Sequence, residues 1–111
     1  MLNQIVLVGR LVEEVEVKEL ESGRKVANVT LAVPRNFKNE DGEYGTDFID
    51  VVIWNSIADN TAEYCKNGDI IGVKGRLETN NYETESGEKR KSTKVIAEKV
   101  TFLSSSKKES E

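Results

Sequence analysis

The stretch at residues 47–55, DFIDVVIWN, places two large aromatic rings on one face of a predicted strand. Successive side chains of a strand point to opposite faces, so Phe48 and Trp54 share the face opposite Ile49, Val51 and Ile53. The three aliphatic residues can supply the buried apolar side chains of a core. The aromatic face is therefore free for another use, and its flat rings can stack on other flat groups.

Two further aromatic residues also lie close to basic side chains. Tyr82 shares a predicted strand face with Lys74 and Arg76, and Phe37 directly precedes Lys38. This combination suits single-stranded nucleic acid, because unpaired bases stack on rings while phosphates pair with cations. The alternative is that the rings lie beneath a loop or in a subunit interface, where aromatic residues are also enriched.

Basic residues near these rings are candidates for phosphate contacts. Three of them end the segment ETESGEKRK at residues 83–91, which is predicted to be a loop. These three could clamp a nucleic-acid backbone, or they could be solvated charges of an ordinary turn. The full candidate set is Arg10, Lys18, Arg35, Lys38, Lys74, Arg76, Lys89, Arg90 and Lys91.

The residues that most enzymes need are missing from this chain. It contains no histidine, the commonest general base and metal ligand. Its single cysteine, Cys65, lies on the apolar side of a predicted helix, where a packing role is favoured over a nucleophile. No glycine-rich phosphate loop occurs in the sequence. We therefore expect no catalysis, no metal site and no cofactor.

Length and composition indicate one small cytoplasmic domain. The 111 residues suit a single core, and one cysteine cannot form an intramolecular disulfide, which fits a reducing compartment. The N-terminal apolar run is too short to span a bilayer and lacks signal-peptide features, so no membrane partner is expected. The net charge of -4 argues against binding through bulk positive charge, so a nucleic-acid site needs local basic clusters.

Apolar alternation predicts an all-β protein with one short helix. The helix is expected to begin at Asn55 or Ser56, either of which can cap it, and to stop at Gly68. Its apolar side would include Tyr64 and Cys65. A mobile hairpin loop is expected between the second and third strands, at residues 39–45. The five strands are predicted over residues 3–19, 25–37, 46–54, 69–82 and 92–103.

Five strands and one helix favour a small closed barrel, because such a sheet must bury one face and limit its edges. The triplet Gly-Arg-Leu occurs in two strands, and Gly9 and Gly75 are expected where strands coil sharply. Pro34 is expected at a strand edge or bulge. The first strand is apolar on both faces up to Val8, which favours a second copy of the chain over a helix or loop as its cover.

Over residues 2–103 the chain resembles the bacterial and phage single-stranded DNA-binding proteins. The matching segments follow the family's order and its loop lengths. They are LNQIVLVGRL at residues 2–11, VANVTLA at 26–32, DFI at 47–49, VVIW at 51–54, AEY at 62–64, KNG at 66–68, GRL at 75–77 and Tyr82.

This resemblance implies an oligonucleotide-binding fold, which is a five-stranded Greek-key barrel, assembled as a homotetramer through the first strands and sheet faces. It also implies that the protein binds and protects single-stranded DNA, without a cofactor, during replication, recombination and repair. The family uses four aromatic stacking positions. In this chain they fall on Phe37, Phe48, Trp54 and Tyr82.

Three departures from the family pattern bear on this function. Asp50 lies between Phe48 and Trp54, where the family more often has a basic or neutral residue, and a carboxylate there repels phosphate. Glu78 and Asn80 occupy positions where cations are expected. Family members normally continue into a linker and an acidic tip that recruits other enzymes. This sequence ends in SSSKKESE instead, so recruitment through such a tip is not expected.

The leading hypothesis is a domain over residues 1–103 that binds single-stranded DNA without strong sequence preference. A disordered tail is expected over residues 104–111, which have no apolar residue to anchor them. The alternative is a barrel of the same fold that has lost its DNA site and serves as a protein-interaction module. The net charge, Asp50 and the acidic loops favour that alternative.

Overall fold

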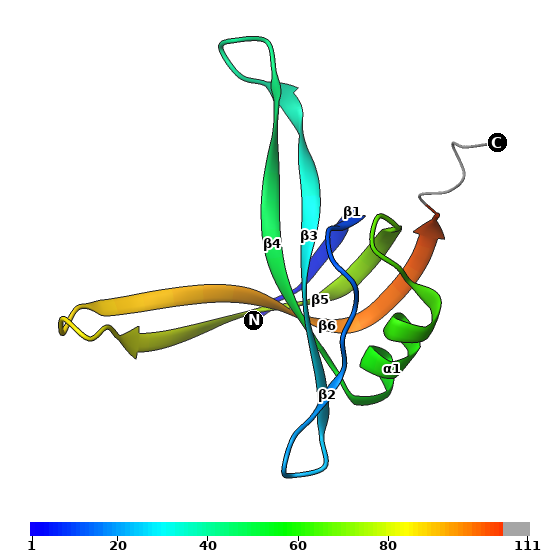
Figure 1. The fold of residues 1–111 in the computed structure, drawn as a ribbon. Coiled ribbons are helices and arrows are strands. Elements are labelled where there is room, and N and C mark those ends of the chain that lie inside the picture. The colour runs from blue at the N-terminus through cyan, green and yellow to red at the C-terminus, as the bar shows by residue number, and fades with distance from the viewer. Residues whose placement is uncertain (106–111) are drawn as a thin grey trace.

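A closed barrel of five strands forms the body of the protein in a computed structural model that describes residues 1–105 (Figure 1). The ring of hydrogen-bonded neighbours runs β1-β5-β6-β4-β3 and returns to β1, which confirms the predicted Greek-key oligonucleotide-binding fold. A two-residue strand, β2, is attached to β3. The elements are β1 Ile5–Leu11, β2 Lys18–Glu19, β3 Lys25–Lys38, β4 Tyr44–Trp54, α1 Asn55–Tyr64, β5 Ile70–Glu83 and β6 Lys89–Ser104.

Two glycines permit the close backbone contacts of the barrel, as the sequence predicted. Near its end, β1 changes its pairing partner from β5 to β3. A Cβ on Gly9 there would lie 2.9 Å from the carbonyl oxygen of Ala32 in β3. A Cβ on Gly75 would overlap the carbonyl oxygen of Ile96, where β5 and β6 shift register. Only glycine allows these strands to approach so closely.

The predicted first strand over residues 3–19 is wrong in its length. β1 ends at Leu11, where the backbone amide donates to the carbonyl of Asp69 (2.9 Å) and not to a strand partner. The acidic segment that follows crosses one end of the barrel, and only Val15 and Val17 pack against the core there. Pairing resumes for just two residues in β2.

The barrel interior is filled by the aliphatic set that strand alternation predicted. Val51 and Ile53 are fully buried, and Ile49 packs at the edge of the core. Leu77 was also expected inside but lies exposed, because β5 has left the barrel at that point. The largest fully buried side chains are Leu11, Val29, Leu31, Val51, Ile53, Ile71, Val73 and Val95.

The helix α1 covers one end of the barrel (Figure 1). It buries Ala58 and Thr61, but it ends at Tyr64, four residues earlier than predicted, and the Tyr64 ring is exposed. The predicted side-chain cap is also wrong. Asn55 has a positive φ of 54°, and its side-chain oxygen accepts a hydrogen bond from the Lys25 amide (3.1 Å). The start of the helix is therefore fixed by a hydrogen bond to β3, a strand that lies far from Asn55 in the sequence.

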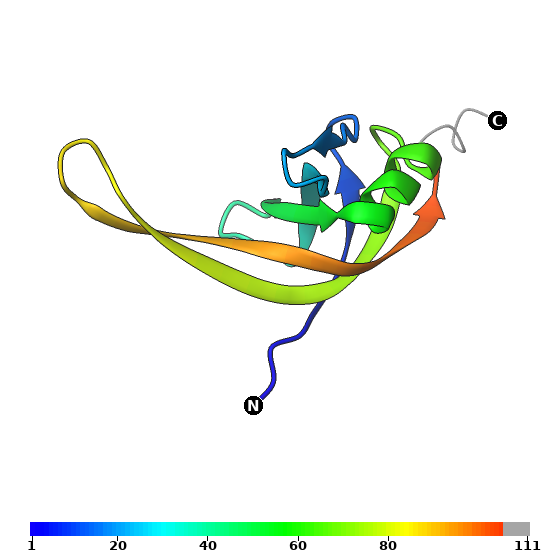
Figure 2. The same cartoon turned by 90° about the horizontal axis from the view of Figure 1, so that it is seen from below.

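Two long hairpins extend beyond the barrel in different directions (Figure 1). We call them the β3–β4 arm, residues 33–48, and the β5–β6 arm, residues 78–94; Figure 2 shows how far the second reaches. The register of β3 and β4 shifts after Pro34, which confirms the predicted bulge. Both arms have exposed faces because no other element covers them within residues 1–105.

Both hairpin loops are shorter than the sequence suggested. The expected loop at residues 39–45 is a tight turn in which the side chain of Asn39 accepts hydrogen bonds from the amides of Asp41 and Glu43. Lys89 to Lys91 belong to β6 and not to a loop. Ser104, expected in the tail, ends β6, and the rest of the expected tail lies outside the described residues except Ser105.

Candidate nucleic-acid interface

The outer face of β3, β4 and β6 carries two of the four predicted stacking residues. Cross-strand partners share a face, and the pairs Val26 with Trp54 and Ala32 with Phe48 align β3 and β4. Ile96 of β6 lies beside Val52 on the same side. We call this surface the aromatic face; its polar members are Asn28, Thr30, Asp50, Ser92 and Lys94.

Trp54 is half-buried at the end of β4. Its ring packs on a small cluster of Val26, Val52 and Ile96, which holds it on the outside of the barrel. The guanidinium carbon of Arg24 lies 4.1 Å from the ring centroid, in a cation–π contact. Arg24 was not among the predicted site residues, because its position depends on how β3 pairs with β4.

Phe48 is 67% exposed at the base of the β3–β4 arm, where β4 is paired with β3 alone. Its partner across the strand pair is Ala32, which is too small to cover the ring. Farther along the same face lies a groove lined by Asn28, Thr30, Asp50 and Lys94 among others, and Phe48 is not part of its lining. Glu13 also lines this groove, so it offers one cation, two carboxylates and neutral hydrogen-bonding groups.

The groove contains Asp50, which departs from the family pattern, and Lys94, a cation that was not predicted as a site residue. The Thr30 hydroxyl donates to the Asp50 carboxylate (3.4 Å), so the acidic group lies on the aromatic face as predicted. Strand alternation back from Ile96 could have found Lys94, since residues two apart on a strand share a face.

Phe37 lies on the β3–β4 arm and is 61% exposed. The guanidinium carbon of Arg35 lies 6.0 Å from its ring centroid. Arg35 also donates to both carboxylate oxygens of Asp47, at distances from 2.8 to 3.2 Å. This hydrogen bonding holds the pKa of Asp47 below its usual value. Arg35 is therefore already paired with a carboxylate.

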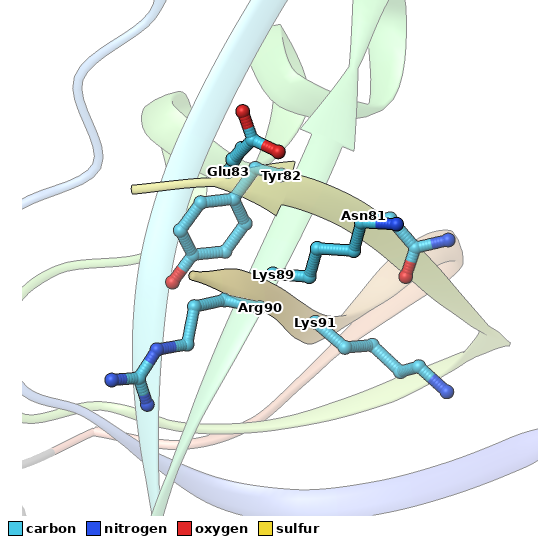
Figure 3. Close-up of a pocket in the computed structure, with 6 residues that line it drawn as sticks. All are labelled: Asn81, Tyr82, Glu83, Lys89, Arg90 and Lys91. Carbon is cyan, nitrogen blue, oxygen red and sulfur yellow. The ribbon is translucent and has the colours of Figure 1, made fainter. Parts of the chain in front are cut away.

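Tyr82 and the three basic residues of the segment 83–91 meet on the β5–β6 arm (Figure 3). Tyr82 is paired with Arg90 across the hairpin, and Asn81 is paired with Lys91. Figure 3 shows Tyr82 and Arg90 reaching to one side while Asn81 and Lys91 point to the other. One side of this arm thus carries a cation beside the Tyr82 ring, and the other side carries a cation beside the Asn81 amide.

The remaining predicted cations are divided between the aromatic face and other surfaces. Lys18 lies next to Val26, in the same cross-strand row as Trp54. Arg76 is the partner of Ile96 at the edge of the aromatic face, but its guanidinium also pairs with Glu78 (3.3 Å).

Of the other predicted cations, Arg10 and Lys74 do not lie on this face, and Lys38 lies beyond it. Arg10 donates to the carbonyl of Gly68 (2.6 Å) near the α1–β5 loop. Lys74 lies between Val6 of β1 and Lys99 of β6, beside the exposed apolar side of β1. Lys38 lies at the tip of the β3–β4 arm.

Cys65, the only cysteine in the chain, is buried. Burial raises the pKa of the Cys65 thiol, and the nearby Asp69 raises it further. A thiol held neutral in this way is a poor nucleophile. Among residues 1–105, no three His, Cys, Asp or Glu side chains lie close enough together to hold a metal ion. No helix within that range is long and apolar enough to cross a membrane.

The barrel, the two arms and the aromatic rings on its outer face define an oligonucleotide-binding fold. The chain belongs to the single-strand binding protein family, whose pattern matches residues 2–103. Single-stranded DNA-binding protein B of Bacillus subtilis is 44% identical over 103 residues, which cover 93% of this chain and 91% of that protein.

Other relatives are longer than this chain. The single-stranded DNA-binding protein of Streptococcus mutans is 44% identical over 95% of this chain, but the match covers 64% of its own length. Among solved structures, a Plasmodium falciparum SSB in complex with ssDNA matches with a TM-score of 0.80. It is 28% identical, and the match covers 93% of this chain and 96% of that one.

Proposed function

We propose that this protein binds single-stranded DNA without strong sequence preference and protects it during replication, recombination and repair. The observation that carries the proposal is that Phe48 and Trp54 lie on one outer face of the barrel, Phe48 67% exposed and Trp54 half-buried. Neither ring enters the barrel interior. A stacked base gains about 1–3 kcal/mol on such a ring, and every base has a π face, so stacking tolerates any sequence.

The cations around this face would hold the phosphates. Lys18 and Lys94 flank the aromatic face, while Lys89, Arg90 and Lys91 extend the positive charge along the β5–β6 arm. Phe37 and Tyr82 would stack bases on the two arms. The proposed strand thus follows a path from one arm to the other across Phe48 and Trp54. Lys38 and Arg76 would add phosphate contacts along this path, whereas Arg10 and Lys74 lie away from it and Arg35 is paired with Asp47.

We also propose that the protein is a homotetramer in the cytoplasm. Val6 and Val8 on the outer side of β1 are 68% and 52% exposed, and a second copy would remove this apolar surface from water. Static light scattering at micromolar concentration checks this, and a monomer mass would contradict it. The single buried thiol fits a reducing compartment.

A second candidate function is a protein-interaction module of the same fold. It is favoured by the pairing of Arg35 with Asp47 and of Arg76 with Glu78, which reduces the positive charge open to phosphate. Such a module would bind no DNA at any salt concentration. DNA binding through cations, in contrast, weakens steeply as salt rises, because bound phosphates release counterions.

The test is the affinity for a fluorescently labelled thymidine oligomer, with duplex DNA as competitor. Trp54→Leu keeps an apolar side chain on the small cluster beneath it but removes the ring, so it should weaken binding by about 1–3 kcal/mol. Tyr64→Leu is the control, because it also removes an aromatic ring, one that is exposed on α1 away from the aromatic face. Equal affinities for wild type and Trp54→Leu would overturn the stacking role.

A further inference from the structure

We propose that Tyr44 is a further base-stacking residue, which extends the aromatic face to the tip of the β3–β4 arm. Its ligand would be a base of the same single strand, beyond the one stacked on Phe48. The proposal rests on the proposed function. Sequence patterns did not point to Tyr44, because residues 39–45 were expected to form a loop.

Strand alternation places Tyr44 in the same row as Phe48. β4 is continuous from Tyr44 to Trp54, so Tyr44, Thr46 and Phe48 point to one side and Gly45 and Asp47 to the other.

Contacts of Arg35 confirm this division of the two sides. A Cβ on Gly45 would lie 3.3 Å from the Arg35 side chain, which also pairs with Asp47. The Phe37 ring lies near that same guanidinium. On the side of β4 that carries Phe48, the next aromatic ring toward the arm tip is therefore that of Tyr44. Phe37 lies on the opposite side of the arm, next to Arg35.

The Tyr44 ring is mostly exposed within residues 1–105. It is 61% exposed, close to the 67% of Phe48. Four residues separate the two rings, which is about 13 Å along a strand, and the short side chain of Thr46 lies between them. Both rings are thus open to the same strand of nucleic acid.

A cation accompanies this ring, as Arg24 accompanies the ring of Trp54. Lys38 is the cross-strand partner of Tyr44, and its Nζ lies 5.6 Å from the ring centroid. A base stacked on the ring would place its phosphate within reach of this ammonium group. The pair therefore supplies both kinds of contact that a nucleotide needs.

The turn beneath Tyr44 is held by hydrogen bonds before any ligand arrives. The Asn39 amide donates to the Glu43 carbonyl (2.8 Å), and the Gly42 amide donates to the Asn39 carbonyl (3.0 Å). The side chain of Asn39 accepts two more amides. A platform ordered in advance loses less entropy on binding, which favours affinity.

The experiment compares Tyr44→Leu, Tyr44→Phe and the control Tyr64→Leu on a long and a very short thymidine oligomer. On the long oligomer, Tyr44→Leu should lose about fivefold or more in affinity, while Tyr44→Phe and Tyr64→Leu should match wild type. On an oligomer of a few nucleotides, which the rings nearer the barrel can occupy, all four proteins should bind alike. Circular dichroism checks that each variant is folded.

The outcomes separate this proposal from the one on which it rests. If wild type binds the long oligomer and Tyr44→Leu binds it equally well, Tyr44 is only a cross-strand partner of Lys38 and the inference is overturned. If wild type binds no single strand at all, both proposals fail. As an independent measurement, photocross-linking of wild type to an iodouracil-containing oligomer should label the peptide with Tyr44, and the absence of that label would contradict the inference.

Discussion

The two arms extend from the same barrel, yet they carry opposite kinds of binding group. The β3–β4 arm presents three exposed rings, Phe37, Tyr44 and Phe48, and its Arg35 is occupied by Asp47. The β5–β6 arm presents one exposed ring, Tyr82, and three consecutive cations at residues 89–91, of which Arg90 is paired with Glu88 (3.0 Å). In the described chain no carboxylate lies within 4 Å of Lys89 or Lys91.

This difference indicates that the two arms would contribute different interactions to DNA binding. Stacking on rings depends little on ionic strength, whereas phosphate contacts weaken as salt rises. A strand bound along both arms would therefore be held by base stacking at one end and by charge at the other. Variants of each arm should be distinguishable by the salt dependence of binding and not only by affinity.

The largest effect is expected on the β5–β6 arm. Replacing Lys89, Arg90 and Lys91 together by Gln should lower the slope of log affinity against log salt by about 2, since each phosphate contact on a single strand contributes about 0.7. At about 0.1 M salt this corresponds to a loss of about 100-fold. Titrations at several salt concentrations measure both quantities.

The control for that variant is the double replacement of Lys66 and Lys99 by Gln, since both lie near α1 and away from the arm. It should leave the slope nearly unchanged. If both variants lower the slope equally, the slope depends on the net charge of the protein and not on phosphate contacts made by the β5–β6 arm.

A somewhat smaller loss is expected on the β3–β4 arm. Phe48→Leu removes a stacking ring and should weaken binding by about 1–3 kcal/mol, with the salt slope unchanged. Titrations over the same salt series measure the slope. A slope that falls with the affinity would mean that Phe48 acts by positioning cations and not by stacking.

Asp50 lies on the path between the arms, and its removal should strengthen binding. Asp50→Asn keeps the size of the side chain and its contact with Thr30 while it removes a charge that repels phosphate. Exposed charges of this kind contribute about 0.2–1 kcal/mol, so a gain of a few-fold in affinity is expected. Glu63→Gln on α1 makes the same change in net charge, and an equal gain there would assign the effect to net charge alone.

The smallest effect concerns Arg35. Asp47→Asn removes its carboxylate partner and should make the β3–β4 arm resemble the other, with a salt slope larger by about 0.7 at most. The same pair contributes to the pH dependence of stability. Because the pKa of Asp47 is lower in the folded chain, its contribution is present above the unfolded pKa and is lost as pH falls through the folded pKa.

Urea unfolding of wild type and Asp47→Asn over this pH range measures that contribution. The stability difference between the two should shrink as pH falls through the folded pKa of Asp47. A difference that does not change with pH would show that the carboxylate charge is not what Arg35 stabilises.

Features that depend on neighbouring residues could be predicted from the sequence. Alternation within β4 placed Phe48 and Trp54 opposite Val51 and Ile53, and the structure confirms this arrangement. Gly9 was expected at a sharp turn of the barrel for a similar reason, since a glycine inside an apolar strand has few other uses.

Features that depend on pairing between distant strands could not be predicted. The length of each arm is set by the register of two strands, so Tyr44 and Lys89 were assigned to loops although both belong to strands. Asn55 was expected to cap α1, but its side chain is held by the Lys25 amide from β3. Arg24 reaches Trp54 for the same reason, through the pairing of β3 with β4.

The most direct test of stacking on the aromatic face is the fluorescence of Trp54, the only tryptophan in the chain. A thymidine oligomer should quench it in a saturable way, duplex DNA should quench it weakly, and added salt should reduce the effect. This result would place bases at Trp54, between the two arms. No quenching and no mobility shift at low salt would contradict the account and favour the protein-interaction module.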